Sequence, residues 1–107
     1  MEDRPMELSV NKTETDANFT INGDIDEQGA EILKKNFLAL DRSSLKNVTF
    51  DFKMVNHIGS AGIGKLLLFY KDIALSGGEL KIINASGEIH KLFLTLKLDT
   101  VFNIQKA

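Results

Sequence analysis

The sequence lacks cysteine and has a single proline, Pro5, among its 107 residues. Without cysteine there is no disulfide, no thiolate metal site and no cysteine nucleophile, and this absence fits a reducing compartment. Long apolar runs are also missing, because the longest, residues 66–70, is too short to cross a bilayer. Residues 1–5 show no basic segment followed by an apolar run, so we expect no signal peptide. These absences predict a cytoplasmic protein without membrane insertion.

An excess of charge of either sign is absent as well. Lysine and arginine number 13 against 15 aspartate and glutamate residues, a net charge of −2, and the basic residues are scattered. Such a chain gains little from counterion release, so we expect no nucleic-acid partner. The composition, 43% hydrophobic and 26% charged, is typical of a globular protein. The length predicts one domain over residues 1–107.

The hydrophobic periodicity predicts five strands and three helices. Alternating apolar residues predict strands at 6–10, 19–23, 48–52, 80–83 and 101–104. Apolar residues at helical spacing predict helices from Asp26 to about residue 41, from about 60 to 76, and from Ser86 to about 96. Asp26 and Ser86 are candidate N-caps, and Gly77-Gly78 is a left-handed helix stop. In the second helix, residues 63, 66, 67, 70, 73 and 74 are expected to face the core.

The predicted order is β-β-α-β-α-β-α-β. Strands that alternate with helices imply an α/β fold, with a mostly parallel mixed sheet flanked by helices and right-handed crossovers. The first two strands follow each other without a helix and are expected to form an antiparallel edge.

The most informative stretch is residues 57–65, with the sequence HIGSAGIGK, between a predicted strand and a predicted helix. Gly62 and Gly64 fall in the first turns of that helix, where each is less favourable than alanine by about 1 kcal/mol. This cost indicates a close approach of the backbone to another part of the chain or to a partner. The helix N-terminus adds free amides and a partial positive charge.

Two interpretations of this stretch compete. The first is a phosphate-binding P-loop, because Gly59-x-x-x-x-Gly64-Lys65 follows a strand and opens a helix, although Leu66 stands where a serine or threonine would hold Mg²⁺. The second is a regulatory serine, Ser60, which is also a candidate N-cap. A phosphate on Ser60 would carry a charge of about −1.5 to −2 at a helix N-terminus that tolerates it, so the fold would survive while the surface changed.

The remaining histidines and acidic residues do not indicate a metal site, a cofactor or a catalytic centre. His57 and His90 are far apart and have no cysteine near them, so we expect no metal site and no cofactor. Asp24, Asp26 and Glu27 are acids that favour a helix dipole, with no feature of a catalytic pair. In the second helix, the run of residues 66–69 is expected to belong to the core. It is slightly broader than one face needs, and Leu68 is the candidate for an exposed contact.

Several stretches together resemble the STAS domains, and among them the single-domain anti-sigma factor antagonists of bacterial partner-switching systems. They cover the chain from about residue 6 to residue 104. The matching stretches are residues 19–26 (a strand and its Gly-acid-aliphatic-Asp turn), 48–52 (the central strand), 58–64 (the serine motif), 77–80 (Gly-Gly before a strand) and 89–93 (the last long helix).

The resemblance implies a protein that binds other proteins and catalyses nothing. Its partner would be an anti-sigma factor, also a serine kinase of the GHKL type, which is captured when Ser60 is unphosphorylated and released after phosphorylation. A PP2C-type phosphatase would reverse the modification. The implied partner-binding residues are Asp24, Asp26, Gly59, Ala61, Gly62, Ile63 and Lys65.

Two positions depart from the family pattern. Gly59 stands where the family has an acidic residue before the serine, and Ala61 stands where many members have a second hydroxyl. The antagonist remains the leading hypothesis, and the loss of the acid adds weight to an alternative within the same fold, a STAS subunit of an ABC-type transport complex that is not controlled by Ser60.

Overall fold

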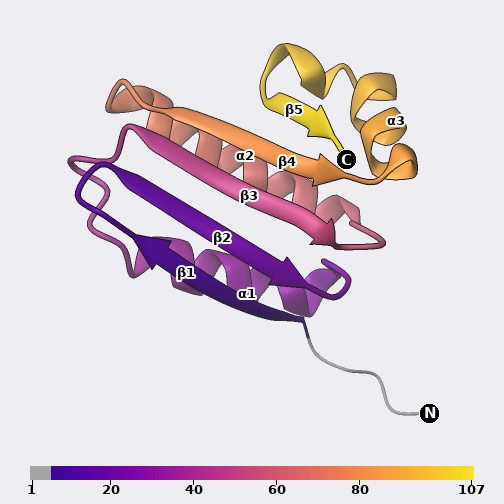
Figure 1. The fold of residues 1–107 in the computed structure, drawn as a ribbon, viewed down its shortest axis with the longest axis horizontal. Helices are drawn as coiled ribbons and strands as arrows, with labels where there is room; N and C mark the ends of the chain where they lie inside the picture. The colour runs from indigo at the N-terminus through magenta and orange to yellow at the C-terminus, as the bar shows by residue number, and fades with distance from the viewer. Residues whose placement is uncertain (1–5) are drawn as a thin grey trace.

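The computed structural model describes residues 6–107 (Figure 1). Pro5 and the segment on which the expected lack of a signal peptide rests lie outside the described residues. The elements are β1 (Glu7–Lys12), β2 (Asp16–Asn22), α1 (Glu27–Leu38), β3 (Asn47–Met54), α2 (Ser60–Leu75), β4 (Glu79–Ala85), α3 (Gly87–Thr95), the 3-10 helix η1 (Leu98–Thr100) and β5 (Asn103–Lys106). None of the helices within residues 6–107 is long and apolar enough to cross a membrane.

The five strands form one sheet in the order β1-β2-β3-β4-β5. β1 is antiparallel to β2, and the other neighbouring pairs are parallel, which confirms the predicted mixed α/β fold and its antiparallel edge. Helices α1 and α2 cover one face of the sheet, and α3 lies beside the end of β4 and β5 (Figure 1). Because the parallel strands point the same way, the loops after β2 and β3 share one edge.

Phenylalanine side chains join the sheet to its two covering helices. Phe19 and Phe50, neighbours on β2 and β3, stack with ring centroids 4.7 Å apart. Phe37 of α1 and Phe69 of α2 stack at 4.2 Å, and the Phe50 and Phe69 rings are 6.1 Å apart. All four rings are buried, and burying an aromatic side chain removes roughly 150–250 Å² from water. This cluster fixes α1 and α2 relative to the strands that precede them.

The backbone geometry confirms the predicted caps of α1 and α3 and the predicted stop after α2, whereas α1 ends at Leu38 and not near residue 41. The Asp26 carboxylate accepts a 2.7 Å hydrogen bond from the amide of Gly29 and caps α1. The Ser86 hydroxyl accepts a 3.2 Å hydrogen bond from the amide of Ile89 and caps α3. Gly77 has φ +79° just after α2, the left-handed stop that the sequence predicts.

The prediction of a strand at residues 101–104 is wrong at its start. Residues 98–100 form η1, and β5 begins only at Asn103. The cause lies one residue earlier, because Lys97 adopts a left-handed conformation with φ +59° and turns the chain out of α3. Phe102 precedes the strand and is buried, and it packs against the Phe93 ring at 6.1 Å.

The predicted core face of α2 is partly wrong. Leu67 is 37% exposed and Ala74 is exposed, whereas Phe69 of the apolar run 66–69 is buried, as expected for that run. The buried residues of α2 are Gly62, Leu66, Phe69 and Ile73. Leu68 is 57% exposed, as expected. The shift follows from the packing of α2 against both α1 and the sheet, which selects one stripe among adjacent apolar residues.

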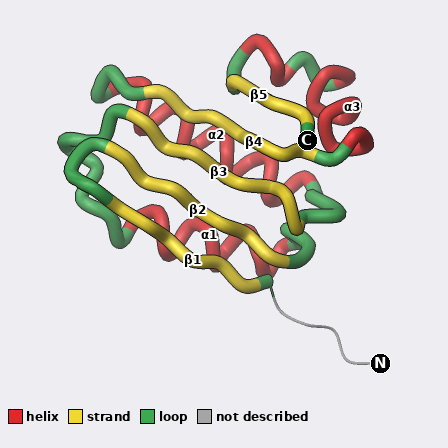
Figure 2. The backbone as a smooth tube through the Cα atoms, viewed as in Figure 1, coloured by secondary structure: helices red, strands yellow, loops and turns green. Residues whose placement is uncertain are grey.

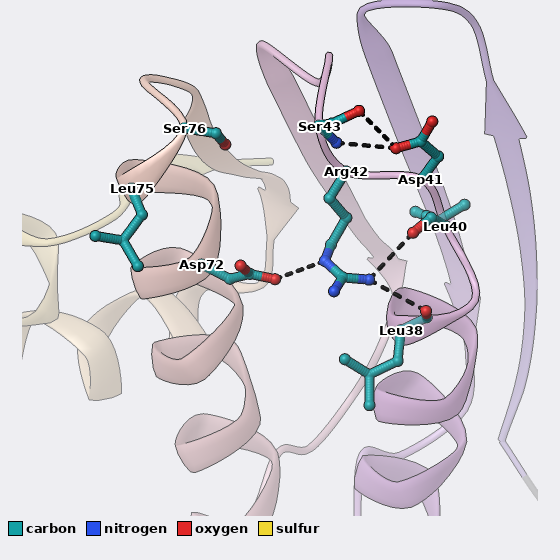
Figure 3. Close-up of a pocket in the computed structure, with 8 residues that line it drawn as sticks. All are labelled: Leu38, Leu40, Asp41, Arg42, Ser43, Asp72, Leu75 and Ser76. Carbon is teal, nitrogen blue, oxygen red and sulfur yellow. Dashed lines mark hydrogen bonds and ion pairs between the residues drawn. The ribbon is translucent and has the colours of Figure 1, made fainter.

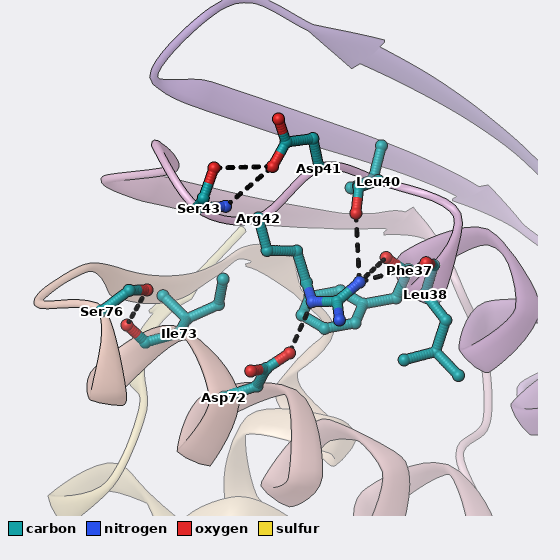
Figure 4. Close-up of polar contacts among 9 residues, drawn as sticks. All are labelled: Phe37, Leu38, Leu40, Asp41, Arg42, Ser43, Asp72, Ile73 and Ser76. Carbon is teal, nitrogen blue, oxygen red and sulfur yellow. Dashed lines mark hydrogen bonds and ion pairs between the residues drawn. The ribbon is translucent and has the colours of Figure 1, made fainter.

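Arg42 fastens the end of α1 to α2 (Figure 4). Its Nε lies 2.6 Å from Asp72 Oδ2, and its Nη1 donates to the carbonyl oxygens of Phe37, Leu38 and Leu40. The guanidinium also lies over the Phe37 ring, 5.3 Å from its centroid. A cation at the last carbonyl groups of a helix satisfies acceptors that have no partner within the helix.

A groove of about 500 Å³ lies beside this ion pair, between the ends of α1 and α2 (Figure 3). Its lining residues are Leu38, Leu40, Asp41, Arg42, Ser43, Asp72, Leu75 and Ser76. Asp41 is exposed at its rim, and hydrogen bonds from the hydroxyl and the amide of Ser43 lower the pKa of its carboxyl group. The groove lies at the end of α2 opposite to Ser60.

Candidate functional site

The loops after β2 and β3 lie side by side at the carboxyl edge of the sheet (Figure 2). Ile25 pairs with Ile58 in a parallel bridge. The Ile25 amide donates to the His57 carbonyl at 2.9 Å, and the Gly59 amide donates to the Ile25 carbonyl at 3.0 Å. These bonds bring the Asp24–Asp26 turn next to the start of α2, although 34 residues separate Asp26 from Ser60.

Gly23 makes the sharp exit from β2 possible. Its φ of +115° is a conformation that residues with a Cβ atom rarely adopt. A Cβ atom at this position would also lie 3.3 Å from the Cα of Met6, which packs beneath the turn. The turn therefore directs Asp24 and Asp26 outward while Ile25 is fully buried.

The predicted site residues differ in their accessibility. Asp24, Asp26 and Ser60 are exposed. Gly59, Ala61, Ile63 and Lys65 are half-buried, and Gly62 is buried. The two loops thus bring the acidic turn and the serine to one surface, whereas Gly62 lies beneath that surface.

Ser60 is the first residue of α2, and the expectation that it is the N-cap is wrong. The N-cap is Gly59, with φ −93° and ψ 177°, and no side chain caps this helix. The hydrogen bond from the Gly59 amide to Ile25 holds Gly59 in the extended conformation and starts the helix one residue later. The first turn of α2 also contains no acidic residue, so no side chain within that turn offsets its free amides and partial positive charge.

Gly62 is required by close packing. A Cβ atom on Gly62 would lie 2.6 Å from Ile25 Cγ2 and 2.9 Å from Ile58 Cγ1. Both contacts are shorter than the separation of non-bonded carbon atoms, about 3.5–4.0 Å. The close approach that the glycines indicate is therefore found at Gly62, where α2 rests on the paired loops.

Gly64 has no such explanation within the chain. It is exposed, and a Cβ atom there would meet no atom within 4 Å. In a helix interior, glycine is less favourable than alanine by about 1 kcal/mol. No contact in the described part of the chain offsets this cost.

Lys65 points toward α1. Its Nζ lies 3.3 Å from Glu31 Oε2, and the lysine side chain is only 22% exposed. The sequence did not indicate Glu31, because the two residues are 34 positions apart and no local pattern links them. This ion pair helps to join α1 to α2 beside the site.

The P-loop interpretation is wrong in its geometry. A P-loop wraps the residues between its first glycine and its lysine around a phosphate. Here residues 60–65 are already helical, and the Ile63 amide donates to the Gly59 carbonyl at 3.1 Å. The parallel strands also follow one another in sequence order, so they form no switch point of the kind that binds nucleotides in doubly wound folds.

Replacing Gly59 with aspartate is expected to stabilise the protein by a few tenths of a kcal/mol, with a further contribution from the helix dipole. The backbone is extended, and the nearest atom to a new Cβ is the Ile25 carbonyl oxygen at 3.9 Å, so the side chain fits and caps α2. Urea unfolding measures the change. Gly59→Ala is the matched control, because its methyl group fits equally well and cannot cap. An aspartate variant no more stable than the alanine variant contradicts the capping geometry.

Solved structures share this fold. An anti-sigma factor antagonist from Mycobacterium paratuberculosis superposes with a TM-score of 0.81 at 19% identity, over 95% of this chain and 86% of that chain. The Bacillus cell fate determinant SpoIIAA in its phosphorylated form superposes with a TM-score of 0.73 at 16% identity, over 92% of this chain and 90% of that chain. At these identities the likeness establishes the arrangement of strands and helices.

Sequence comparison gives the family. The anti-sigma-B factor antagonist of Bacillus subtilis (strain 168) is 27% identical over 97 residues, which cover 91% of this chain and 88% of that protein. The family model for the STAS domain matches residues 7–107, from the start of β1 to the last residue of the sequence. The fold, the order of the motifs and this match agree, and the chain belongs to the STAS domain family.

Proposed function

We propose that this protein is an anti-sigma factor antagonist that works by partner switching and not by catalysis. It binds an anti-sigma factor, which is also a serine kinase of the GHKL type, while Ser60 is unphosphorylated. Phosphorylation of Ser60 releases the partner, and a PP2C-type phosphatase in the cytoplasm restores binding. The observation that carries the proposal is the exposed position of Ser60 at the start of α2, beside the acidic turn of residues 24–26.

The start of α2 suits a phosphate group. Helix N-termini present backbone amides and a partial positive charge to anions, and α2 has no acidic residue in its first turn. A phosphate on Ser60 meets this field without displacing a capping side chain, because the helix has none. The modified protein is therefore expected to keep its fold.

The neighbouring charges explain how a phosphate would change recognition. Asp24 and Asp26 are exposed on the turn that is hydrogen-bonded to Gly59, next to Ser60. Phosphorylation would add a charge of about −1.5 to −2 to this acidic surface. A partner that packs closely against the unmodified hydroxyl would leave no room for the phosphate. It would also have to desolvate the phosphate charge beside an acidic turn, which opposes docking.

The named relatives support this proposal. The curated relative and the mycobacterial structure are named anti-sigma factor antagonists, and SpoIIAA is known in a phosphorylated form. In this chain Ser60 is the only residue with a hydroxyl group between residues 50 and 69, so the site of modification has one candidate in the motif.

Phosphorylation of Ser60 can be tested directly. Each GHKL-type anti-sigma factor of the source organism is purified and incubated with this protein and ATP, and the products are examined by intact mass and peptide mapping. We expect one of them to add a single phosphate at Ser60, and Ser60→Ala to remain unmodified. Ser43 serves as an internal control, because it is also exposed but is hydrogen-bonded to Asp41.

Two results would contradict the proposal. One is the absence of both binding and phosphorylation with every such anti-sigma factor. The other is the recovery of an ABC-type ATPase, in place of an anti-sigma factor, when the tagged protein is isolated from its own cells.

A further inference from the structure

The exposed side of α2 carries large apolar residues. Leu67, Leu68 and Leu75 are 37%, 57% and 81% exposed, while the opposite side of the helix faces the core. Positions 60, 64, 67, 68, 71 and 75 recur at the period of a helix, so these leucines share one face with Ser60 and Gly64. Lys71 is the charged residue on this face.

This face continues onto α1 at the far end of the helix. Leu38 is 52% exposed and lines the same groove as Leu75 (Figure 3). We call Gly64, Leu67, Leu68, Leu75 and Leu38 the α2 strip. A helix of 16 residues is about 24 Å long, so the strip extends from near Ser60 to the opposite edge of the sheet. Lys71 lies between Leu68 and Leu75 on this face, and the Arg42–Asp72 ion pair lies between Leu75 and Leu38, so charge interrupts the row of leucines. Exposed apolar residues gathered on one face indicate an interaction site in a soluble protein.

Gly64 belongs to the strip and indicates a close approach from outside. Glycine is unfavourable within a helix, and the space above Gly64 contains no atom of this chain. Gly62, two residues earlier, is explained by Ile25 and Ile58, whereas Gly64 has no internal contact. A bare backbone at this point lets a partner side chain lie directly against α2.

The exposed surface of the two loops around Ser60 is too small to form a stable interface by itself, and this indicates which partner covers the strip. A stable protein interface uses about 20–30 residues on each side. The exposed residues of the two loops around Ser60, within 23–27 and 55–60, supply only part of that number, since Ile25, Val55 and Ile58 are buried. A partner that binds stably at Ser60 must also cover adjacent surface, and the strip begins one helical turn away at Gly64.

We propose that the α2 strip is the second half of the docking surface for the anti-sigma factor. The occupant is an apolar surface of that partner, packed lengthwise along α2 from Gly64 to Leu75 and carrying no basic group opposite Lys71. This inference rests on the proposed function and extends it. The two halves have different tasks: the strip supplies affinity through apolar burial, and Ser60 decides whether the partner can approach.

The test measures binding of the anti-sigma factor that binds the wild-type protein most tightly, by isothermal titration calorimetry. We expect Leu68→Gln and Leu75→Gln each to weaken binding by about 10-fold or more, and the double variant by about 100-fold. Leu94→Gln is the matched control, because Leu94 is 44% exposed on α3, away from the strip. Circular dichroism and urea unfolding are expected to show that all variants remain folded.

The outcomes separate this inference from the proposed function. Affinities of the Leu68 and Leu75 variants within about twofold of wild type, together with loss of binding in Ser60→Asp, overturn the strip and leave the switch intact. The absence of binding to any anti-sigma factor overturns both. A second copy of this chain is the other candidate occupant, so a wild-type dimer in sedimentation that Leu75→Gln converts to a monomer also overturns the inference.

Discussion

Replacing Ser60 with aspartate is expected to weaken binding of the anti-sigma factor by at least about 100-fold. For comparison, a change from almost fully bound to almost fully free partner requires a difference in affinity of about 10⁴-fold. The new carboxylate lies at the start of α2, which is hydrogen-bonded to the turn that carries Asp24 and Asp26, and docking at the proposed surface would have to desolvate its charge. Stability should not fall, because an acid in the first turn of α2 interacts favourably with the helix dipole by about 0.3–1 kcal/mol. Calorimetric titration measures the affinity, and urea unfolding measures the stability.

Ser60→Asn is the matched control for this prediction. Asparagine has the shape of aspartate without its charge, so we expect it to retain most of the affinity. Equal losses in the two variants would assign the effect to side-chain volume, and undiminished binding of Ser60→Asp would contradict an electrostatic switch at this residue.

Replacing Gly62 with valine is expected to lower the free energy of unfolding by about 2–3 kcal/mol, since overpacking a well-filled core costs about that much. The methyl groups would enter the space of Ile25 Cγ2, 2.6 Å from the ideal Cβ position, and Ile25 is fully buried. A change of this size lowers the melting temperature by roughly 10 °C in a domain of this length.

The control for Gly62 lies two residues away in the same helix. Gly64→Ala adds a methyl group where no atom lies within 4 Å, and we expect it to raise the free energy of unfolding by about 1 kcal/mol. Urea unfolding of both variants measures the change in the free energy of unfolding, which we expect to be negative for Gly62→Val and positive for Gly64→Ala. A Gly62→Val variant as stable as the wild type would contradict this prediction, because it would show that the paired loops can move to accommodate the larger side chain.

The sequence was sufficient to predict the elements that carry a long, regular pattern. Alternation over residues 48–52 predicts β3, and the spacing of Ala30, Leu33 and Phe37 predicts α1. Asp26 can be identified as an N-cap from the sequence, because an aspartate directly before a helical apolar pattern can accept a hydrogen bond from an amide of the first turn. These features depend on neighbouring residues alone.

The features that were not predicted depend on distant contacts. Serine and glycine are both good N-caps, and the choice of Gly59 is made by its hydrogen bond to Ile25, 34 residues earlier. Adjacent leucines such as Leu66 and Leu67 are equally apolar, and the packing of α2 against both α1 and the sheet decides which of them is buried. The left-handed turn at Lys97 has no sequence signal, because lysine does not favour it.

The parallel pairing of Ile25 with Ile58 has a consequence for what a partner detects. The proposed surface around Ser60 combines two segments of the chain: the acidic turn precedes β3 in the sequence, and the serine follows it. A nascent or denatured chain displays the same serine but lacks the acidic turn beside it, and a linear peptide spanning residues 55–65 has the same defect. If the partner contacts both segments as proposed, only a chain with the assembled sheet would present the complete surface, and unfolded copies would not bind the partner.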